Sequence, residues 1–147
     1  MLESSLKRAG VGAQSLGIEI TEGYTARLEV AKDAILKLRR LGHPVHIDDF
    51  GTGYSSLSYL HDLEVDGIKI DRTFTRAIGT ESVTVSIIPQ ILAMAAALKL
   101  QVTVEGIETA EQADYFAAGA LPILVQGWYF GYPMPAAEFY RLLEKSE

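Results

Sequence analysis

The chain alternates short runs of β-branched residues with longer stretches whose apolar residues recur at helical spacing. The short runs predict strands at residues 16–20, 45–48, 67–70, 101–105 and 123–126. The longer stretches predict helices at residues 25–41, 56–63, 82–100, 109–118 and 136–145, and residues 1–9 fit the end of another helix. Such alternation is typical of a parallel sheet covered by helices, either an open doubly wound sheet or a (β/α) barrel.

Four of the predicted strands have one apolar and one polar face. In Ile18-Glu19-Ile20 the two isoleucines share a face and Glu19 lies on the other. The same alternation places these residues on the polar face: His46, Asp48, Lys69, Asp71, Thr103 and Glu105. An open sheet covered by helices on both sides should be apolar on both, whereas a barrel encloses a lumen and carries its catalytic side chains at the C-terminal strand ends. The pattern therefore favours an α/β fold of the barrel type.

The number of predicted strands is too small for a closed barrel. A closed (β/α) barrel needs eight strands and about 250 residues, but the chain has 147 residues. We therefore expect residues 1–147 to form one partial TIM-like barrel domain of about five parallel strands with outer helices, lacking the N-terminal strands. Exposed strand edges favour self-association, so we expect a homodimer or a domain-swapped oligomer.

Composition excludes several classes of function. There is no cysteine, which excludes a disulfide scaffold, a cysteine-ligated metal and thiol catalysis. The net charge of −6, without a basic cluster, argues against binding to a nucleic acid polymer or directly to a membrane surface. The N-terminal residues lack the apolar core of a signal peptide. A cytoplasmic location is expected, which is compatible with attachment to a larger membrane-anchored sensor.

Acidic residues gather at the predicted strand ends, with a single cation, Lys69, among them. These residues are Glu19, Glu22, Asp48, Asp49, Asp71, Glu105 and Glu108. Crowded carboxylates destabilise a fold unless positive charge lies between them. Oxygen ligands at this density suit Mg²⁺ or Mn²⁺, and two such ions can promote phosphodiester cleavage. We favour a metal-dependent site over the alternative, ordinary strand-end charges that face solvent.

Five motifs, taken in order, make this prediction specific. They are Glu19-Ile20-Thr21-Glu22, residues 48–57 (DDFGTGYSSL), Lys69-Ile70-Asp71, Glu105-Gly106-Ile107-Glu108 and Gln126-Gly127-Trp128. Together they make residues 16–140 resemble the EAL-domain family of cyclic di-GMP phosphodiesterases. The resemblance implies a modified (β/α) barrel, a two-metal site for Mg²⁺ or Mn²⁺, and hydrolysis of cyclic di-GMP to linear pGpG.

The resemblance also implies which residues hold the metal ions and act in catalysis. Glu19, Asp48, Asp49 and Glu105 would be the metal ligands, with Asp48 as the bridge between the two ions. Asp49 and Glu105 would also belong to the catalytic group, together with Lys69. We expect Lys69 to act on the water or the phosphate electrostatically, because an ammonium among carboxylates is stabilised in its charged form.

Other matched residues are implied to shape the site from outside. Glu22 would fix the loop of residues 50–57, and Asp71 would be a partner of Lys69. Glu108 and Gln126 would line or support the substrate site. Two alternatives stay open: Asp71 could simply pair with Arg72 or cap the following turn, and Glu108 could instead act on the dipole of the following helix.

The chain differs from the family most in lacking two of its motifs. The Glu-Ala-Leu segment that names the family, and an asparagine ligand on the next strand, have no counterpart before Glu19. We therefore expect this chain alone to be inactive or severely impaired, although the parent protein is expected to be an active enzyme. The alternative function is a non-catalytic module that binds cyclic di-GMP or another protein. Trp128, Tyr129 and Phe130 are expected to be core residues rather than a surface on which guanine stacks.

Overall fold

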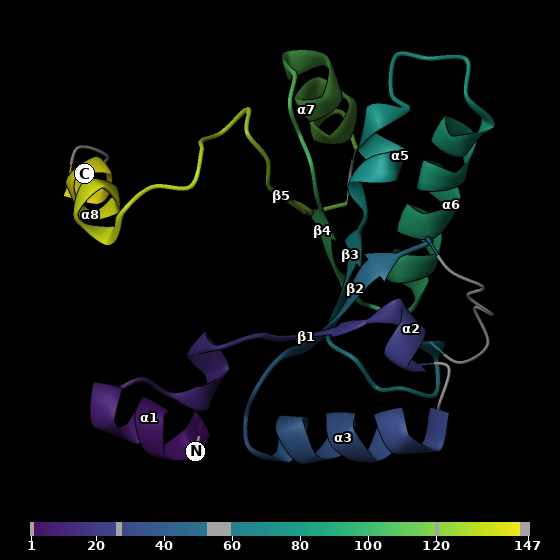
Figure 1. Ribbon diagram of the computed structural model, residues 1–147. Coiled ribbons are helices and arrows are strands. Elements are labelled where there is room, and N and C mark those ends of the chain that lie inside the picture. The colour runs from purple at the N-terminus through teal and green to yellow at the C-terminus, as the bar shows by residue number, and fades with distance from the viewer. Residues whose placement is uncertain (1, 26–27, 53–59, 120, 145–147) are drawn as a thin grey trace.

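The computed structural model describes residues 2–25, 28–52, 60–119 and 121–144 (Figure 1). The strands are β1 (Ile18–Thr21), β2 (Val45–Phe50), β3 (Gly67–Ile70), β4 (Gln101–Val104) and β5 (Leu124–Val125). The helices are α1 (Leu2–Ala9), α2 (Glu22–Thr25), α3 (Leu28–Arg40), α5 (Arg72–Arg76), α6 (Val83–Ala97), α7 (Ala110–Ala117) and α8 (Ala136–Glu144). A short 3₁₀ helix, η1 (Ala13–Ser15), joins α1 to β1.

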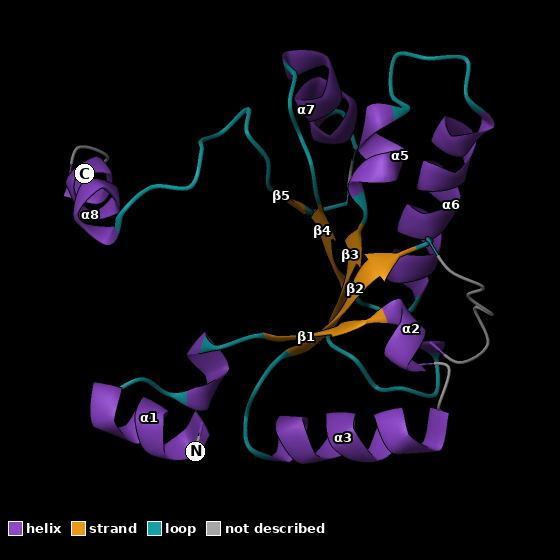
Figure 2. Ribbon diagram, viewed as in Figure 1, coloured by secondary structure: helices purple, strands orange, loops and turns teal. Residues whose placement is uncertain are grey.

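The five strands form one parallel sheet in the order β1-β2-β3-β4-β5, so neighbours in sequence are neighbours in space (Figure 2). A doubly wound sheet would reverse its strand order at a switch point. Strand order that follows the sequence, with helices between the strands, is the arrangement of part of a (β/α) barrel. The predicted fold class is confirmed.

The two faces of the sheet differ as the alternation predicted. The apolar residues of β2, β3 and β4 are buried: Val45, Ile47, Ile68, Ile70, Val102 and Val104. They join a core with buried residues of two long helices, Ala31 and Ile35 of α3 and Ile88 of α6. The opposite face carries the polar residues that build the candidate site.

Two of the predicted helices include residues that the structure does not describe. The helix predicted at 25–41 corresponds to α3 (Leu28–Arg40), with Thr25 at the end of α2, and residues 26–27 are outside the described ranges. Half of the helix predicted at 56–63, residues 56–59, also lies outside those ranges. The structure adds α5, which the sequence pattern missed because five residues, two of them β-branched threonines, give no helical periodicity.

The C-terminal segment leaves the sheet after β5, and α8 lies apart from the strands (Figure 1). None of the residues of α8 is buried. Trp128, Tyr129 and Phe130 are also exposed, at 58%, 49% and 56%. The expectation that these three aromatic residues belong to the core is therefore wrong for this chain. Across the described ranges, no helix combines the length and the apolar character needed to cross a membrane.

Candidate functional site

Lys69 is the centre of the site. It lies on β3, a strand whose four residues are all buried, and its side chain is only 9% exposed. Its Nζ atom lies 2.9 Å from Glu19 Oε2, 3.1 Å from Asp48 Oδ1 and 2.6 Å from Glu105 Oε1. These carboxylates come from β1, β2 and the residue just after β4. The alternation of faces thus brings together side chains that are far apart in the sequence.

The surroundings of Lys69 fix its protonation state. Burial by itself lowers the pKa of the ammonium, but contacts with the carboxylates of Glu105, Glu19 and Asp48 outweigh it and raise the pKa of Lys69 above the ordinary lysine value. Lys69 is therefore charged at neutral pH. A charged ammonium has no lone pair to accept a proton, which supports an electrostatic role over proton abstraction.

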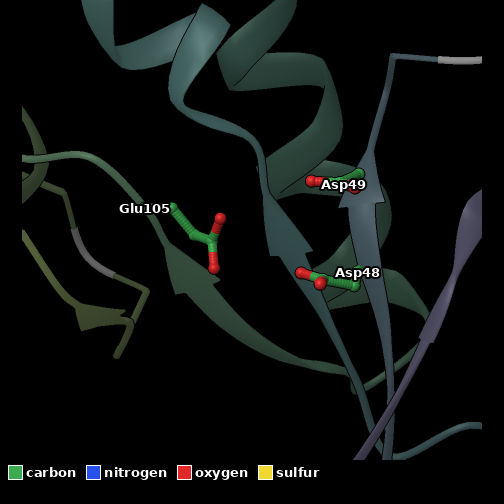
Figure 3. A group of neighbouring side chains, drawn as sticks. All are labelled: Asp48, Asp49 and Glu105. Atoms are coloured by element: carbon green, nitrogen blue, oxygen red, sulfur yellow. The ribbon is translucent and has the colours of Figure 1, made fainter.

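A bulge in β2 changes the direction of Asp49. The pairing of β2 with β3 shifts register between Ile47 and Phe50, and Asp49 has a left-handed backbone with φ of 56°. In a regular strand, consecutive residues point to opposite faces. The extra residue of a bulge breaks this rule, and Figure 3 shows the carboxylates of Asp48 and Asp49 both pointing toward Glu105.

Asp48, Asp49 and Glu105 form a group of oxygen donors. One carboxylate oxygen from each lies within 4.8 Å of the others. Asp48 Oδ1 is buried and lies 3.1 Å from Lys69 Nζ. It accepts no hydrogen bond of good geometry from the described residues. Together with Glu19 these residues carry four negative charges against one on Lys69, a net charge of 1 − 4 = −3. Hard oxygen donors with uncompensated charge suit Mg²⁺ or Mn²⁺, so the residues fit the predicted ions.

Gln126 is held beside Glu105. Its Nε2 atom donates a hydrogen bond to Glu105 Oε1 at 2.9 Å. Its backbone N–H donates to Val104 O at 2.9 Å, and its carbonyl accepts from Ile107 N at 3.1 Å. The next residue, Gly127, lies against the Ile107 backbone so closely that a Cβ atom would clash with it. These contacts place the Gln126-Gly127-Trp128 motif against the Glu105–Glu108 motif.

Glu22 contacts the start of the loop that follows the aspartate pair. It is buried at the beginning of α2, and its Oε2 accepts a hydrogen bond from Gly51 N at 3.1 Å. Glu22 is expected to fix the loop of residues 50–57, and the structure shows it in contact with one residue of that loop, Gly51. The remainder of the expected contact concerns residues 53–59, which lie outside the described part of the chain.

Asp71 caps α5. Its Oδ1 accepts a hydrogen bond from Thr73 N at 2.9 Å at the N-terminus of that helix. Burial by itself raises the pKa of Asp71, but hydrogen bonds from Thr73 and Arg72 and the charge of Arg72 outweigh it and lower the pKa below the ordinary value. The expected partnership with Lys69 is not found among the ion pairs of the described residues, so the capping alternative describes this side chain.

Replacing Asp71 with alanine is expected to lower the free energy of unfolding by about 1 kcal/mol at pH 7, because the helix loses its N-cap. Since the pKa of Asp71 is lowered on folding, its stabilisation is complete above the unfolded value of about 3.9 and disappears as the pH falls through the folded value. Urea unfolding between pH 7 and pH 3 checks this. Asp71→Asn retains a capping oxygen without titrating and serves as the control; an alanine variant as stable as the wild type at pH 7 would contradict the cap.

Glu108 lies at the wall of a cavity next to the carboxylates. Its Oε1 lies 3.6 Å from Arg76 Nη2. The cavity has a volume of about 470 Å³, and it is also lined by Glu105, Gln126, Arg72 and Trp128. Sequence reasoning placed Glu108 and Gln126 near the substrate but missed Arg72, because Arg72 is carried by α5, which was not predicted.

Comparison with known proteins agrees with this geometry. Residues 1–133 match the EAL domain family. The chain is 37% identical over 145 residues to the probable cyclic di-GMP phosphodiesterase PdeB of Escherichia coli K12, an alignment that covers 99% of this chain and 27% of PdeB. The chain thus spans about a quarter of the length of this curated relative.

Two solved structures have the same fold. The EAL domain of Mycobacterium smegmatis DcpA has a TM-score of 0.87 and 34% identity, with 98% of this chain and 65% of that one covered. The manganese and cyclic di-GMP complex of Klebsiella pneumoniae BlrP1 has a TM-score of 0.81 and 32% identity, with 90% of this chain and 34% of that one covered. A family match over most of the chain, a common fold and carboxylates that converge on one lysine lead to one conclusion: this chain belongs to the EAL-domain family.

Proposed function

We propose that the chain is the C-terminal part of a cyclic di-GMP phosphodiesterase that hydrolyses one phosphodiester to give linear pGpG. The observation that carries the proposal is the convergence of Glu19, Asp48 and Glu105 on Lys69, with Asp49 brought in by the bulge. The similarity to cyclic di-GMP phosphodiesterases and to a manganese and cyclic di-GMP complex supports the same reaction.

Asp48, Asp49 and Glu105 would hold Mg²⁺ or Mn²⁺, with Glu19 as a further ligand. When bound, such ions supply positive charge for the phosphodiester oxygens and activate water. An acidic protein can bind an anionic dinucleotide in this way, because metal ions reverse the sign of the local field.

The chain's own residues orient the site. Lys69 holds three carboxylates that would otherwise repel one another, and its charge is available to the phosphate. Gln126 fixes Glu105 through a hydrogen bond at 2.9 Å. Glu22 fixes the backbone at Gly51, two residues after Asp49. Precise placement of ligands by such outer contacts is what metal sites require.

The test of this function separates metal binding from turnover. We expect residues 1–147 to bind Mn²⁺, measured by calorimetry. We expect them to release pGpG from cyclic di-GMP only slowly, because the part of the chain that the structure describes contains five strands, whereas a closed barrel has eight. Asp48→Ala should abolish both signals. Metal binding that survives Asp48→Ala would contradict the proposed site, and turnover at an ordinary enzymatic rate of about 1 s⁻¹ or more would contradict the impairment.

A non-catalytic binding module is the competing function. It predicts that cyclic di-GMP binds equally well in EDTA and in Mn²⁺, and that Asp48→Ala leaves this binding unchanged. We favour the enzyme because the acidic residues and Lys69 are assembled in one site. The calorimetric titrations above distinguish the two functions directly.

We also propose that the chain self-associates. Among the described residues, β1 and β5 each pair with one strand only, and apolar side chains between residues 128 and 143 are exposed. Sedimentation is expected to show a dimer or larger species at tens of micromolar protein. Tyr140→Glu with Leu143→Glu should shift the distribution toward the monomer, because both side chains are exposed on α8. A wild-type chain that stays monomeric at high concentration would contradict self-association.

A further inference from the structure

We call residues 105–109, which join β4 to α7, the glutamate loop, because they include Glu105 and Glu108. β4 ends one residue before Glu105, whose N–H still donates to Ile70 O of β3 at 3.0 Å. At the next residue, Gly106, the backbone turns through a left-handed conformation with φ of 70°. The pairing of β3 with β4 therefore ends at Glu105, and contacts with other segments hold the loop beyond it.

Thr75 of α5 is fully buried against the start of the glutamate loop. Its Oγ1 lies 3.0 Å from Glu105 O and 3.3 Å from Gly106 O, and it also lies 2.9 Å from Arg72 O in its own helix. A threonine hydroxyl in a helix commonly bonds to a carbonyl of the preceding turn. The contacts with Glu105 and Gly106 go beyond this habit, because they join α5 to a segment about 30 residues later in the chain.

Gln112 ties the far end of the glutamate loop to the same residue of α5. It is 8% exposed and lies on α7, beside α5 (Figure 1). Its Oε1 accepts hydrogen bonds from Glu108 N at 2.7 Å and from Thr109 N at 3.1 Å, and its Nε2 donates to Thr75 O at 3.2 Å. The hydroxyl and the carbonyl of Thr75 thus hold opposite ends of one loop. Buried polar groups that find partners in this way make a structure rigid.

The Glu105 carboxylate needs such a rigid backbone. Its Oε1 lies 2.6 Å from Lys69 Nζ and accepts a hydrogen bond from Gln126 Nε2 at 2.9 Å, so one oxygen meets two donors at once. Contacts of this length weaken steeply when their geometry changes. Because α5 follows β3 after a single residue, Thr75 links the strand that carries Lys69 to the loop that carries Glu105.

We propose that Thr75 is a positioning residue for the Glu105 carboxylate, with Gln112 holding the same loop at its far end. The inference rests on the proposed function, in which Glu105 would hold a metal ion. Thr75 acts through the main-chain carbonyl of Glu105 and touches no metal-ligating atom itself. Replacing a residue that orients a metal ligand typically lowers metal affinity by 10- to 100-fold.

The experiment removes the hydroxyl of Thr75 while keeping the shape of the side chain. Thr75→Val exchanges the hydroxyl for a methyl group, and calorimetry on the 147-residue chain should show Mn²⁺ binding weakened by about 10- to 100-fold. Thr75→Ser keeps the hydroxyl and should recover most of the Mn²⁺ affinity. Thr75→Ala also lacks the hydroxyl but adds no methyl group against the carbonyls, so it gives the same test if Thr75→Val does not fold. Circular dichroism checks the fold of each variant.

A control variant separates positioning from a general loss of stability. Leu38 packs against the core near the end of α3, at the edge of the sheet where the strands begin and opposite the carboxylates. Leu38→Ala should lower the free energy of unfolding in urea and leave the Mn²⁺ affinity unchanged. If Leu38→Ala weakens Mn²⁺ binding as much as Thr75→Val does, or if Thr75→Ser binds Mn²⁺ as poorly as Thr75→Val, the proposal is overturned.

A second measurement needs no metal. In EDTA the side-chain amide of Gln126 reports on Glu105, because its Nε2 donates to Oε1 of that carboxylate. Its ¹H and ¹⁵N resonances, identified by their loss in Gln126→Ala, should move in Thr75→Val toward their positions in Glu105→Gln, where the acceptor has lost its charge. In Thr75→Ser they should stay near their wild-type positions. Resonances that do not move in Thr75→Val overturn the proposal.

The two measurements let this proposal and the proposed function fail separately. Mn²⁺ binding that depends on Asp48 but is unchanged in Thr75→Val overturns the positioning role and leaves the proposed function standing. Gln126 resonances that move in Thr75→Val and return in Thr75→Ser, in a wild-type chain that binds no Mn²⁺, support the positioning of Glu105 and overturn the proposed metal-dependent reaction.

Discussion

Replacing Lys69 with methionine is expected to lower the free energy of unfolding in EDTA by about 2–4 kcal/mol. Methionine retains the length of the apolar stem but leaves the carboxylates of Glu19, Asp48 and Glu105 facing one another without a counter-charge. The expected loss of stability is smaller than for a fully buried ion pair, because these carboxylates are between 19% and 47% exposed and water screens part of their repulsion. Urea unfolding measures the change.

Mn²⁺ should reverse this destabilisation. If the ions occupy the carboxylates, they replace the missing positive charge, and an ion that binds the folded state stabilises it by mass action. The variant should therefore gain more stability from Mn²⁺ than the wild type, while remaining without phosphodiesterase activity. Lys37→Met, at an exposed position of α3, is the control and should change neither quantity appreciably. A Lys69 variant that is as stable as the wild type in EDTA would show that the three ion pairs contribute nothing.

Replacing Asp48 with asparagine is expected to weaken Mn²⁺ binding by about 100-fold or more. Residues that only orient a metal ligand cost 10- to 100-fold in affinity when they are changed, and removal of a ligand should cost at least as much. The substitution preserves the size of the side chain but removes the charge on Oδ1, a buried atom within 3.1 Å of Lys69. Calorimetric titration with Mn²⁺ gives the affinity.

The stability of the Asp48→Asn variant separates binding from folding. Lys69 retains Glu19 at 2.9 Å and Glu105 at 2.6 Å, so the free energy of unfolding in EDTA should change little. Asp33→Asn, which alters an exposed aspartate on α3, is the matched control and should bind Mn²⁺ like the wild type. Unchanged Mn²⁺ affinity in Asp48→Asn would refute the assignment of Asp48 as a ligand.

The strand pattern could be predicted because it depends on a strong and simple rule. Side chains alternate along a strand, so Glu19, Asp48 and Lys69 share a face wherever their strands are regular. Parallel strands place their C-terminal ends at one edge, which brings Glu105 to the same site. The centre of the candidate site therefore follows from local periodicity and parallel pairing alone.

Other features could not be predicted, because they depend on contacts between segments. A five-residue helix after Asp71 leaves no periodic signal, so Arg72 had no predicted place. Trp128 has a large aromatic side chain of the kind that is usually buried. It is exposed because the chain leaves the sheet after β5. Periodicity by itself directs Asp49 toward the helices, and only the register shift against β3 reverses that direction.

That register shift gives the stretch from Ile47 to Phe50 a fixed length. Adding or removing one residue there would exchange the environments of its side chains, turning a carboxylate into the apolar core and Phe50 out of it. Substitutions at Asp48 or Asp49 change charge while the chain path is preserved. A change in residue number would damage chemistry and packing together, so protein engineering in this stretch should exchange amino acids and never insert or delete them.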